Sequence, residues 1–220
     1  MKINFNKIKV LAFDFDLTLV DSSKICISIN NIMSKNHGIF FDKIPDKERW
    51  GATFKLNSQK AKLLNDTTLS AQEIEDLTLN YAFEHYKDIK ICSQESLRKW
   101  QARGVSFAII SGNTKKIIEK SLQNKWNRGL VFDPIYETNS GHSKTERLIE
   151  LMKNLKLNND EIVYIGDHIN DVVAAQKANV GSIAVLTGTL ERDDFTPYKP
   201  DLIIANLDAL NNYWGHNDRT

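Results

Sequence analysis

The sequence predicts an α/β protein in which a Rossmann-like parallel sheet carries an inserted α-helical cap. Three observations lead to this prediction. Strand-length apolar runs alternate with amphipathic helical patterns along most of the chain, as they do in a parallel sheet with helices on both faces. The main apolar runs end in small or acidic residues. Residues 21–89 break the alternation, because they hold several helical patterns and no strong strand pattern.

The expected strands are rich in Val and Ile and almost continuously apolar, which is typical of strands buried on both faces. Four runs have this character strongly: Ile8–Phe13, Val105–Ile110, Ile162–Ile165 and Ser182–Leu186. Two shorter candidates are Leu130–Phe132 and Leu202–Ala205. Because helical patterns separate the strands, we expect parallel pairing through right-handed crossovers.

The expected core helices are Thr114–Lys125, Lys144–Leu155 and Ile169–Ala178. Ser143 and Glu146 have the spacing of a capping box at the start of the second helix. Ser70 and Glu73 have the same spacing inside the inserted stretch. We therefore expect residues 1–20 and 90–220 to form an α/β core. Residues 21–89 would form a helical cap over the ends of the strands.

Charge and composition exclude several classes of function. The 29 basic and 28 acidic residues leave a net charge of +1, so no overall field attracts the protein to nucleic acid or membranes. No run approaches the roughly 18 apolar residues of a membrane span, and no signal-peptide pattern is present. The two cysteines, Cys26 and Cys92, suit free thiols in a reducing compartment. We expect a cytoplasmic monomer or homodimer with a small-molecule substrate.

Polar residues stand where the strongest apolar runs end. Any one of them is ordinary for a loop or a helix start. In an open α/β sheet, however, ligands bind beyond the carboxyl ends of the strands, so the predicted topology brings these residues together at one candidate site. They are Asp14 and Asp16 after the first run, then Ser111, Gly112 and Asn113, then Lys144 at a helix start, and finally Asp167 and Asp171.

Four of these segments, in this order, resemble the motifs of the haloacid dehalogenase superfamily. FDFDLTLVDS resembles the first motif of the family, an aspartate pair after the first strand. AIISGN resembles the second motif, an apolar strand that ends in Ser or Thr. Lys144 lies where the family places a phosphate-binding lysine, and the fourth motif, GDxxxD, resembles YIGDHINDVVAAQKANV. The resemblance covers Ile8–Asp21 and about Val105–Leu210. The helical insert is similar to the small caps of the phosphoglycolate phosphatase-like branch.

The resemblance implies a Mg²⁺-dependent phosphatase that acts through an aspartyl-phosphate. Asp14 would be the nucleophile, which divides one difficult hydrolysis into two easier steps. Asp16 would protonate the leaving alcohol and then activate water. Mg²⁺ prefers carboxylate, carbonyl and water oxygens. The resemblance implies that it binds the carboxylates of Asp14 and Asp167 and the carbonyl of Asp16. Asp171, one helical turn after Asp167, would orient the Asp167 carboxylate or a metal-bound water.

A second set of residues would contact the phosphoryl group, whose charge redistributes in the transition state. The family commonly has glycine at the position of Leu17. The backbone N–H of Leu17 is still available to the phosphate, whereas the leucine side chain would narrow the space near the cap. The residues expected to contact the phosphate or to support that contact are Leu17, Thr18, Ser111, Gly112, Asn113 and Lys144.

The cap sequence divides by charge. Residues 43–62 include six basic and two acidic residues, whereas residues 63–89 include six acidic residues and one lysine. A basic edge facing the site would hold a carboxylate or second phosphate of the substrate, and Arg49, beside Trp50 and Gly51, is the candidate for that contact. The alternative is a pair of solvated helix faces with Trp50 in the core. The five histidines have no metal-ligand spacing.

Other interpretations remain open. A phosphomutase of the same superfamily uses the same two aspartates, and transfer to a second sugar hydroxyl in place of water would reveal it. A non-catalytic regulatory protein could retain the fold, although receiver-like domains lack both the helical insert and the later GDxxxD. Asp16 argues against a dehalogenase, which has no leaving alkoxide to protonate. Phosphoglycolate-like acids, sugar phosphates and nucleoside monophosphates are all candidate substrates.

Overall fold

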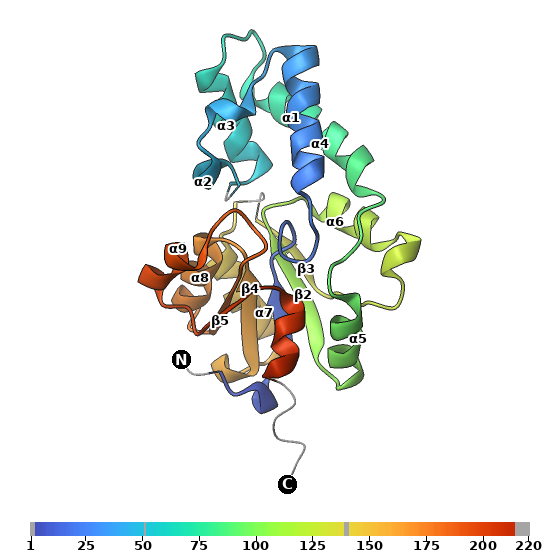
Figure 1. The fold of residues 1–220 in the computed structure, drawn as a ribbon, viewed down its shortest axis with the longest axis vertical. Coiled ribbons are helices and arrows are strands. Elements are labelled where there is room, and N and C mark those ends of the chain that lie inside the picture. Colours follow the sequence, from blue (N-terminus) through green and yellow to red (C-terminus); the bar gives the residue numbers. More distant parts are fainter. Residues whose placement is uncertain (1–2, 51, 139–140, 214–220) are drawn as a thin grey trace.

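A computed structural model of the protein describes residues 3–50, 52–138 and 141–213. Its core is a parallel sheet of six strands in the order β3-β2-β1-β4-β5-β6, which confirms the predicted fold class. β1 lies inside the sheet, between β2 and β4 (Figure 1). The strands are β1 (Val10–Phe13), β2 (Ser106–Ser111), β3 (Ile135–Glu137), β4 (Ile162–Gly166), β5 (Gly181–Val185) and β6 (Leu202–Ile204).

One predicted strand is wrong. Residues 130–132 form no strand, and the sheet is extended instead by β3. Phe132 packs in the core against Phe13 and Phe107, which accounts for the apolar run. β3 lies at the edge of the sheet, is partly exposed along its length and has three residues. It therefore lacks the continuous apolar pattern of a strand buried on both faces.

Helices cover both faces of the sheet because successive strand residues point in opposite directions. Leu11 and Phe13 of β1 belong to the apolar cluster that includes side chains of α5 (Gln94–Ala102) and α6 (Lys115–Leu122). Val10 and Ala12 belong to a second cluster, with side chains of α7 (Lys144–Leu155) and α8 (Ile169–Lys177). A short helix, α9 (Arg192–Phe195), follows β5. No element was predicted for the α5 stretch.

Both predicted capping boxes are present. The Ser143 hydroxyl accepts a hydrogen bond from the Glu146 N–H at 3.2 Å, and the Glu146 carboxylate accepts one from the Ser143 N–H at 2.7 Å. These bonds satisfy amide groups that a helix start leaves unpaired, and α7 begins at Lys144 as predicted. Ser70 and Glu73 pair in the same way at the start of the helix Ala71–Tyr86.

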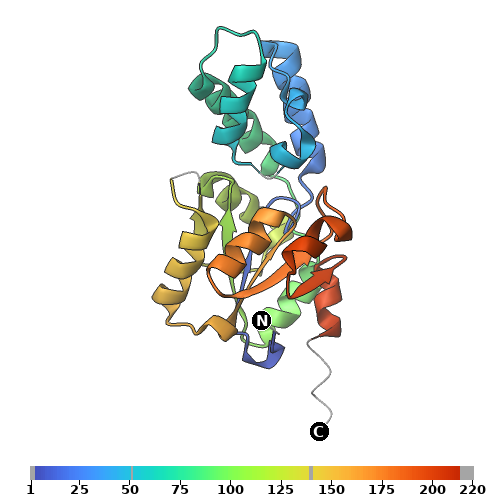
Figure 2. The same ribbon diagram turned by 90° about the vertical axis from the view of Figure 1, so that its left-hand side faces the viewer.

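Four helices lie beyond the carboxyl ends of the strands, as Figures 1 and 2 show. They are α1 (Ser23–His37), α2 (Asp46–Arg49), α3 (Phe54–Leu64) and α4 (Ala71–Tyr86). The two chain segments that connect them to the sheet are joined: Val20 pairs with Ile91 in an isolated bridge, and the Cys92 N–H donates to the Leu19 carbonyl at 2.7 Å. We call α1 to α4 and the segments between them (residues 23–86) the helical unit. Its apolar side chains belong to the same cluster as those that pack on the sheet.

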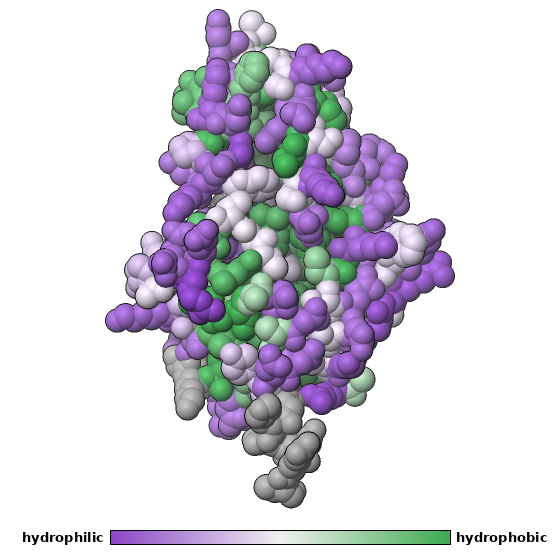
Figure 3. Space-filling model, viewed as in Figure 1, coloured by the Kyte–Doolittle hydropathy of each residue, from purple (hydrophilic) through white to green (hydrophobic). Residues whose placement is uncertain are grey.

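Polar side chains cover much of the face seen in Figure 3, and apolar ones show between them both over the helices at the top of the view and over the half that holds the sheet. Among the described residues, no helix combines the length and apolar character needed to cross a membrane. Cys26 and Cys92 are both free thiols and both partly buried.

Candidate active site

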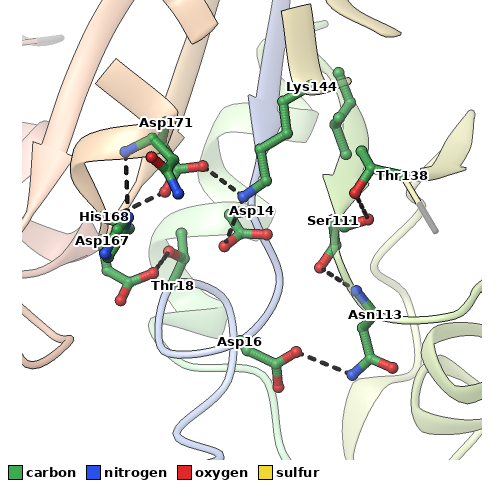
Figure 4. Close-up of polar contacts among 12 residues, drawn as sticks. Asp14, Asp16, Thr18, Ser111, Asn113, Thr138, Lys144, Asp167, His168 and Asp171 are labelled. Carbon is green, nitrogen blue, oxygen red and sulfur yellow. Dashed lines mark hydrogen bonds and ion pairs between the residues drawn. The ribbon is translucent and has the colours of Figure 1, made fainter. Parts of the chain in front are cut away.

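Three neighbouring strands end at the same edge of the sheet and carry the site. Asp14 follows β1, Ser111 ends β2 and Asp167 follows β4. The Asp14 N–H donates to the Ile165 carbonyl at 2.8 Å, so regular pairing with β4 extends as far as Asp14. Lys144 comes from the first turn of α7 and reaches towards Asp14 (Figure 4). The predicted topology therefore places these polar residues in one small volume.

Lys144 is held between two carboxylates. Its Nζ lies 2.6 Å from Asp171 Oδ1 and 3.2 Å from Asp14 Oδ2. Burial alone would lower the pKa of Lys144, but the carboxylates of Asp14 and Asp171 raise it above the usual range. Lys144 is thus a fixed positive charge at the floor of the site. Asp171 also accepts a hydrogen bond from the His168 N–H at 3.0 Å, at the start of α8.

The carboxylates of Asp14, Asp167 and Asp171 form a compact group in which one oxygen atom of each lies within 4.8 Å of one oxygen atom of the other two. Asp14 Oδ1 is buried and accepts no hydrogen bond from the described part of the chain. Burial raises the pKa of Asp14 to about 6, despite the opposing effect of Lys144. Burial and the neighbouring carboxylates raise the pKa of Asp167 as well. Three acidic groups facing one lysine, with an unused oxygen among them, fit a hard divalent cation.

Two glycines allow these carboxylates to pack closely. A Cβ atom on Gly166 would lie 2.2 Å from Asp171 Cγ, and one on Gly188 would lie 2.1 Å from Asp167 Oδ2. Both contacts are far inside the van der Waals limit, so a side chain at either position would displace a carboxylate. Gly188 received no site role from the sequence, where its only signal was a Thr-Gly pair after an apolar run.

Asp16 lies apart from this acidic group and is held between the core and the helical unit. Asp16 Oδ1 accepts a hydrogen bond from the Tyr86 hydroxyl at 2.5 Å, and Oδ2 accepts one from Asn113 Nδ2 at 2.9 Å. Burial raises the pKa of Asp16, while these hydrogen bonds lower it by a smaller amount. The side chain of Asn113 thus contacts Asp16 and also lines the cavity, and its phosphate contact stays a prediction. Tyr86 was not singled out from the sequence.

Ser111 and Thr18 also have partners at the site. Ser111 Oγ accepts a hydrogen bond from the Asn113 N–H at 3.1 Å, and Ser111 and Gly112 both line the cavity above Asp14. The Thr18 hydroxyl donates to Asp167 Oδ1 at 3.1 Å. Thr18 does not line the cavity, so it supports an acidic side chain and lies away from the position expected for substrate.

Leu17 adopts a backbone conformation that usually belongs to glycine. Its φ is 56°, in the left-handed region, where a side chain costs roughly 1–2 kcal/mol. The Thr187 hydroxyl donates to the Leu17 carbonyl at 2.5 Å, and the side chain is almost fully buried. Leu17 lines the cavity. The glycine expected from the resemblance would relieve the backbone cost but lose this apolar wall.

A cavity of about 490 Å³ opens above Asp14, between the strand ends and the helical unit. Apolar side chains, including Ile29, Phe41 and Phe54, form part of its wall on the helical side. Arg49 also lines the cavity, and its side chain is 14% exposed. Its Nη2 is paired with Asp46, whereas its Nε and Nη1 have no hydrogen-bond partner in the described part of the chain. Buried guanidinium N–H groups without acceptors suit an anionic ligand.

The other members of the basic edge do not face the cavity. Lys47 pairs with Asp194, Lys60 pairs with Glu48, and Lys43 and Lys62 donate to backbone carbonyls. Lys55 is exposed and lies outside the cavity lining. The idea of a basic edge over the site is therefore wrong except for Arg49. Trp50 is partly buried and lines the cavity, and Gly51 lies outside the described residues.

Residues 11–185 match the family model described as haloacid dehalogenase-like hydrolase. The chain is 26% identical to a phosphoglycolate phosphatase of Colwellia psychrerythraea and 25% identical to one of Synechococcus elongatus; each match covers 92% of this chain and 95% of the relative. It is also 23% identical to a pyrophosphatase, PpaX, of Oceanobacillus iheyensis, over 91% of this chain and 94% of the relative.

Solved structures show the same fold. A predicted phosphoglycolate phosphatase of Haemophilus somnus superposes with a TM-score of 0.76 at 20% identity, covering 94% of this chain and 98% of that one. CbbY of Rhodobacter sphaeroides, solved in complex with phosphate, has a TM-score of 0.75 at 16% identity and covers 92% of this chain and 96% of its own. These likenesses extend over the helical unit as well as the sheet.

Proposed function

The chain belongs to the haloacid dehalogenase-like hydrolases, and on that premise we propose that it is a Mg²⁺-dependent phosphatase with Asp14 as nucleophile. The observation that carries the proposal is the position of Asp14. Its Oδ1 is buried and has no hydrogen-bond donor among the described residues, below a cavity of about 490 Å³, and its Oδ2 is paired with Lys144. An unengaged carboxylate oxygen is free to attack, and Lys144 stabilises the charge of an incoming phosphate.

The reaction has two balanced steps. In the first, an Asp14 oxygen forms a bond to phosphorus as the ester P–O bond breaks, and Asp16 gives its proton to the departing alkoxide. In the second, water attacks the phospho-aspartate, its proton passes to Asp16, and the Asp14–phosphorus bond breaks to release inorganic phosphate. Ser111 and the backbone N–H groups beside it would hold the phosphoryl oxygens in both steps.

The acidic group is the proposed metal site. Asp14, Asp167 and the Asp16 carbonyl would hold Mg²⁺, with Asp171 as support through Lys144 and the start of α8. When bound, Mg²⁺ offsets the repulsion between a carboxylate nucleophile and an anionic phosphate. The geometry that supports this assignment is the closeness of three carboxylates around one lysine.

We propose phosphate esters of small hydroxy acids, of which phosphoglycolate is the simplest, as the substrates to test first. Two of the relatives compared above are named phosphoglycolate phosphatases. Arg49 Nε and Nη1, which have no acceptor among the described residues, are available to a carboxylate. Sugar phosphates and nucleoside monophosphates are the other classes for the panel. We also propose residues 21–89 as the cap, a cytoplasmic location, and a monomer or homodimer as the active form.

Phosphate release from such a panel, with and without Mg²⁺, tests the function. We expect Mg²⁺-dependent release that is lost in Asp14→Asn. Arg49→Met should raise KM for carboxylate-bearing esters by about tenfold or more, because one charge-assisted contact contributes about 1.5–3 kcal/mol. Lys55→Met, from the same basic edge but outside the cavity, is the matched control. No release from any ester by folded, Mg²⁺-bound protein would refute the proposed function.

A further inference from the structure

We infer that Tyr86 is the positioning residue for Asp16, and that its hydroxyl holds the Asp16 carboxyl in place through both steps of the proposed reaction. The inference rests on the proposed function, since it assigns a purpose to Asp16 as acid and base. It adds to Arg49 a second polar residue of the helical unit with a role at the site. The carrying observation is the 2.5 Å hydrogen bond between Tyr86 Oη and Asp16 Oδ1.

The position of the Tyr86 hydroxyl is fixed by packing. Tyr86 is the last residue of α4 and is 1% exposed. Its ring stacks against Phe15, with centroids 6.3 Å apart and planes inclined at 29°. Phe15 lies between the two aspartates of the loop after β1, so the same loop that carries Asp16 also supports the tyrosine ring. A rigid ring places its hydroxyl more accurately than a flexible side chain would.

The chemistry of the hydroxyl explains why a tyrosine is useful here. A carboxyl that works as acid and base must be held both when it carries a proton and when it does not. Asn113 Nδ2 can only donate, and Asn113 Oδ1 is already engaged with the Thr114 N–H at 2.8 Å. A phenol hydroxyl can donate to the carboxylate and can accept from the carboxylic acid. The Ser22 hydroxyl also lies near enough to Asp16 to lower its pKa, but it has no partner within hydrogen-bond distance in the described part of the chain. Of the two described side chains within hydrogen-bond distance of Asp16, Tyr86 is therefore the one that suits both states.

Loss of the hydroxyl should impair proton delivery in particular. Tyr86→Phe keeps the stacked ring but leaves Asp16 Oδ1 without its donor, so the carboxyl can rotate away from the leaving oxygen. An alkyl ester such as phosphoglycolate releases a strongly basic alkoxide and needs the proton. p-Nitrophenyl phosphate releases a weakly basic phenolate that departs without one. The parameter kcat/KM covers the steps up to leaving-group departure, so it isolates this half of the reaction.

The experiment compares kcat/KM for the two esters in the wild type, Tyr86→Phe and Tyr81→Phe. Tyr81 is the matched control, because it lies on the same helix and its hydroxyl contacts His37 away from the site. We expect Tyr86→Phe to lose about 10- to 100-fold on phosphoglycolate and less than about threefold on p-nitrophenyl phosphate. Tyr81→Phe should match the wild type on both esters.

Adding Asp16→Asn completes the test. If Tyr86 acts through Asp16, Tyr86→Phe should have no further effect on phosphoglycolate in the Asp16→Asn background. An equal loss on both esters, or an additional loss in that background, would assign Tyr86 a structural role and overturn the inference while the phosphatase stands. Wild-type activity on neither ester nor the rest of the panel would remove the proposed function, and this inference with it.

Discussion

The buried acidic group should make the metal-free protein less stable at neutral pH than at mildly acidic pH. Burial raises the pKa of Asp14 from 3.8 to about 6, so the native state binds this proton more tightly than the unfolded chain does. A raised carboxyl pKa therefore costs stability as the pH rises from the unfolded value through the folded one. Burial also raises the pKa values of Asp16 and Asp167, and both shifts act in the same direction.

The size of the effect follows from the shift of Asp14. A difference of about 2.2 pKa units corresponds to about 3 kcal/mol in total. A little under half of this, about 1.4 kcal/mol, develops between about pH 5 and pH 7.5. Asp14 is 8% exposed, so solvent screens little of it. His168 opposes the trend. Burial lowers its pKa, so the unfolded chain binds this proton more tightly than the native state does, and the free energy of unfolding decreases as the pH falls through the pKa values of this histidine.

Urea unfolding in the presence of EDTA, over that pH window, measures the effect. Subtracting the profile of Asp14→Asn removes the contribution of His168 and of the exposed groups. We expect the free energy of unfolding of the wild type, relative to the variant, to fall by about 1–2 kcal/mol from about pH 5 to pH 7.5. Saturating Mg²⁺ should remove or reverse this fall, since it binds the ionised carboxylates. Parallel profiles without metal would refute the electrostatic account of the site.

Two other substitutions follow from the same geometry. Lys144→Met should abolish turnover and lower the free energy of unfolding of the metal-free protein by about 3–5 kcal/mol, because it leaves buried carboxylates unpaired. Lys153→Met, at an exposed position of the same helix, is the control. Similar unfolding midpoints for the two variants would contradict the prediction. Gly166→Ala should lower the free energy of unfolding by about 1–3 kcal/mol and weaken Mg²⁺ binding measured by calorimetry, because the Cβ of the new alanine would overlap Asp171. Unchanged Mg²⁺ affinity would contradict the prediction and show that Asp171 can move without affecting the metal.

The sheet was predictable wherever strands are buried on both faces. β1, β2, β4 and β5 have continuous apolar runs because helices cover them above and below, and the topology then brought Asp14, Lys144 and Asp167 together. β3 was missed because it is a short, partly exposed edge strand, whose residues carry no comparable pattern. Phe132 produced the false signal, since it is a core residue outside any strand.

The helical unit was less predictable, because sequence patterns do not show which face of a helix meets the site. Arg49 faces the cavity, whereas Lys47 on the same short helix pairs with Asp194 of the core. Tyr86 is 70 residues from Asp16 and reaches it only through the packing of α4 against the core. Asn113 was predicted at the site and lines the cavity, but the contact of its side-chain amide with Asp16 depends on tertiary packing that the sequence does not show.

Covalent capture of the phosphorylated protein tests the central claim, that Asp14 attacks phosphorus. The protein would be mixed with a radiolabelled substrate ester and Mg²⁺, quenched in acid within one turnover, and digested for mass spectrometry. Borohydride reduction converts an aspartyl-phosphate to homoserine, which identifies the residue. The account predicts label and homoserine at Asp14, and neither in Asp14→Asn. Turnover without any labelled protein, or label on a different residue, would contradict it.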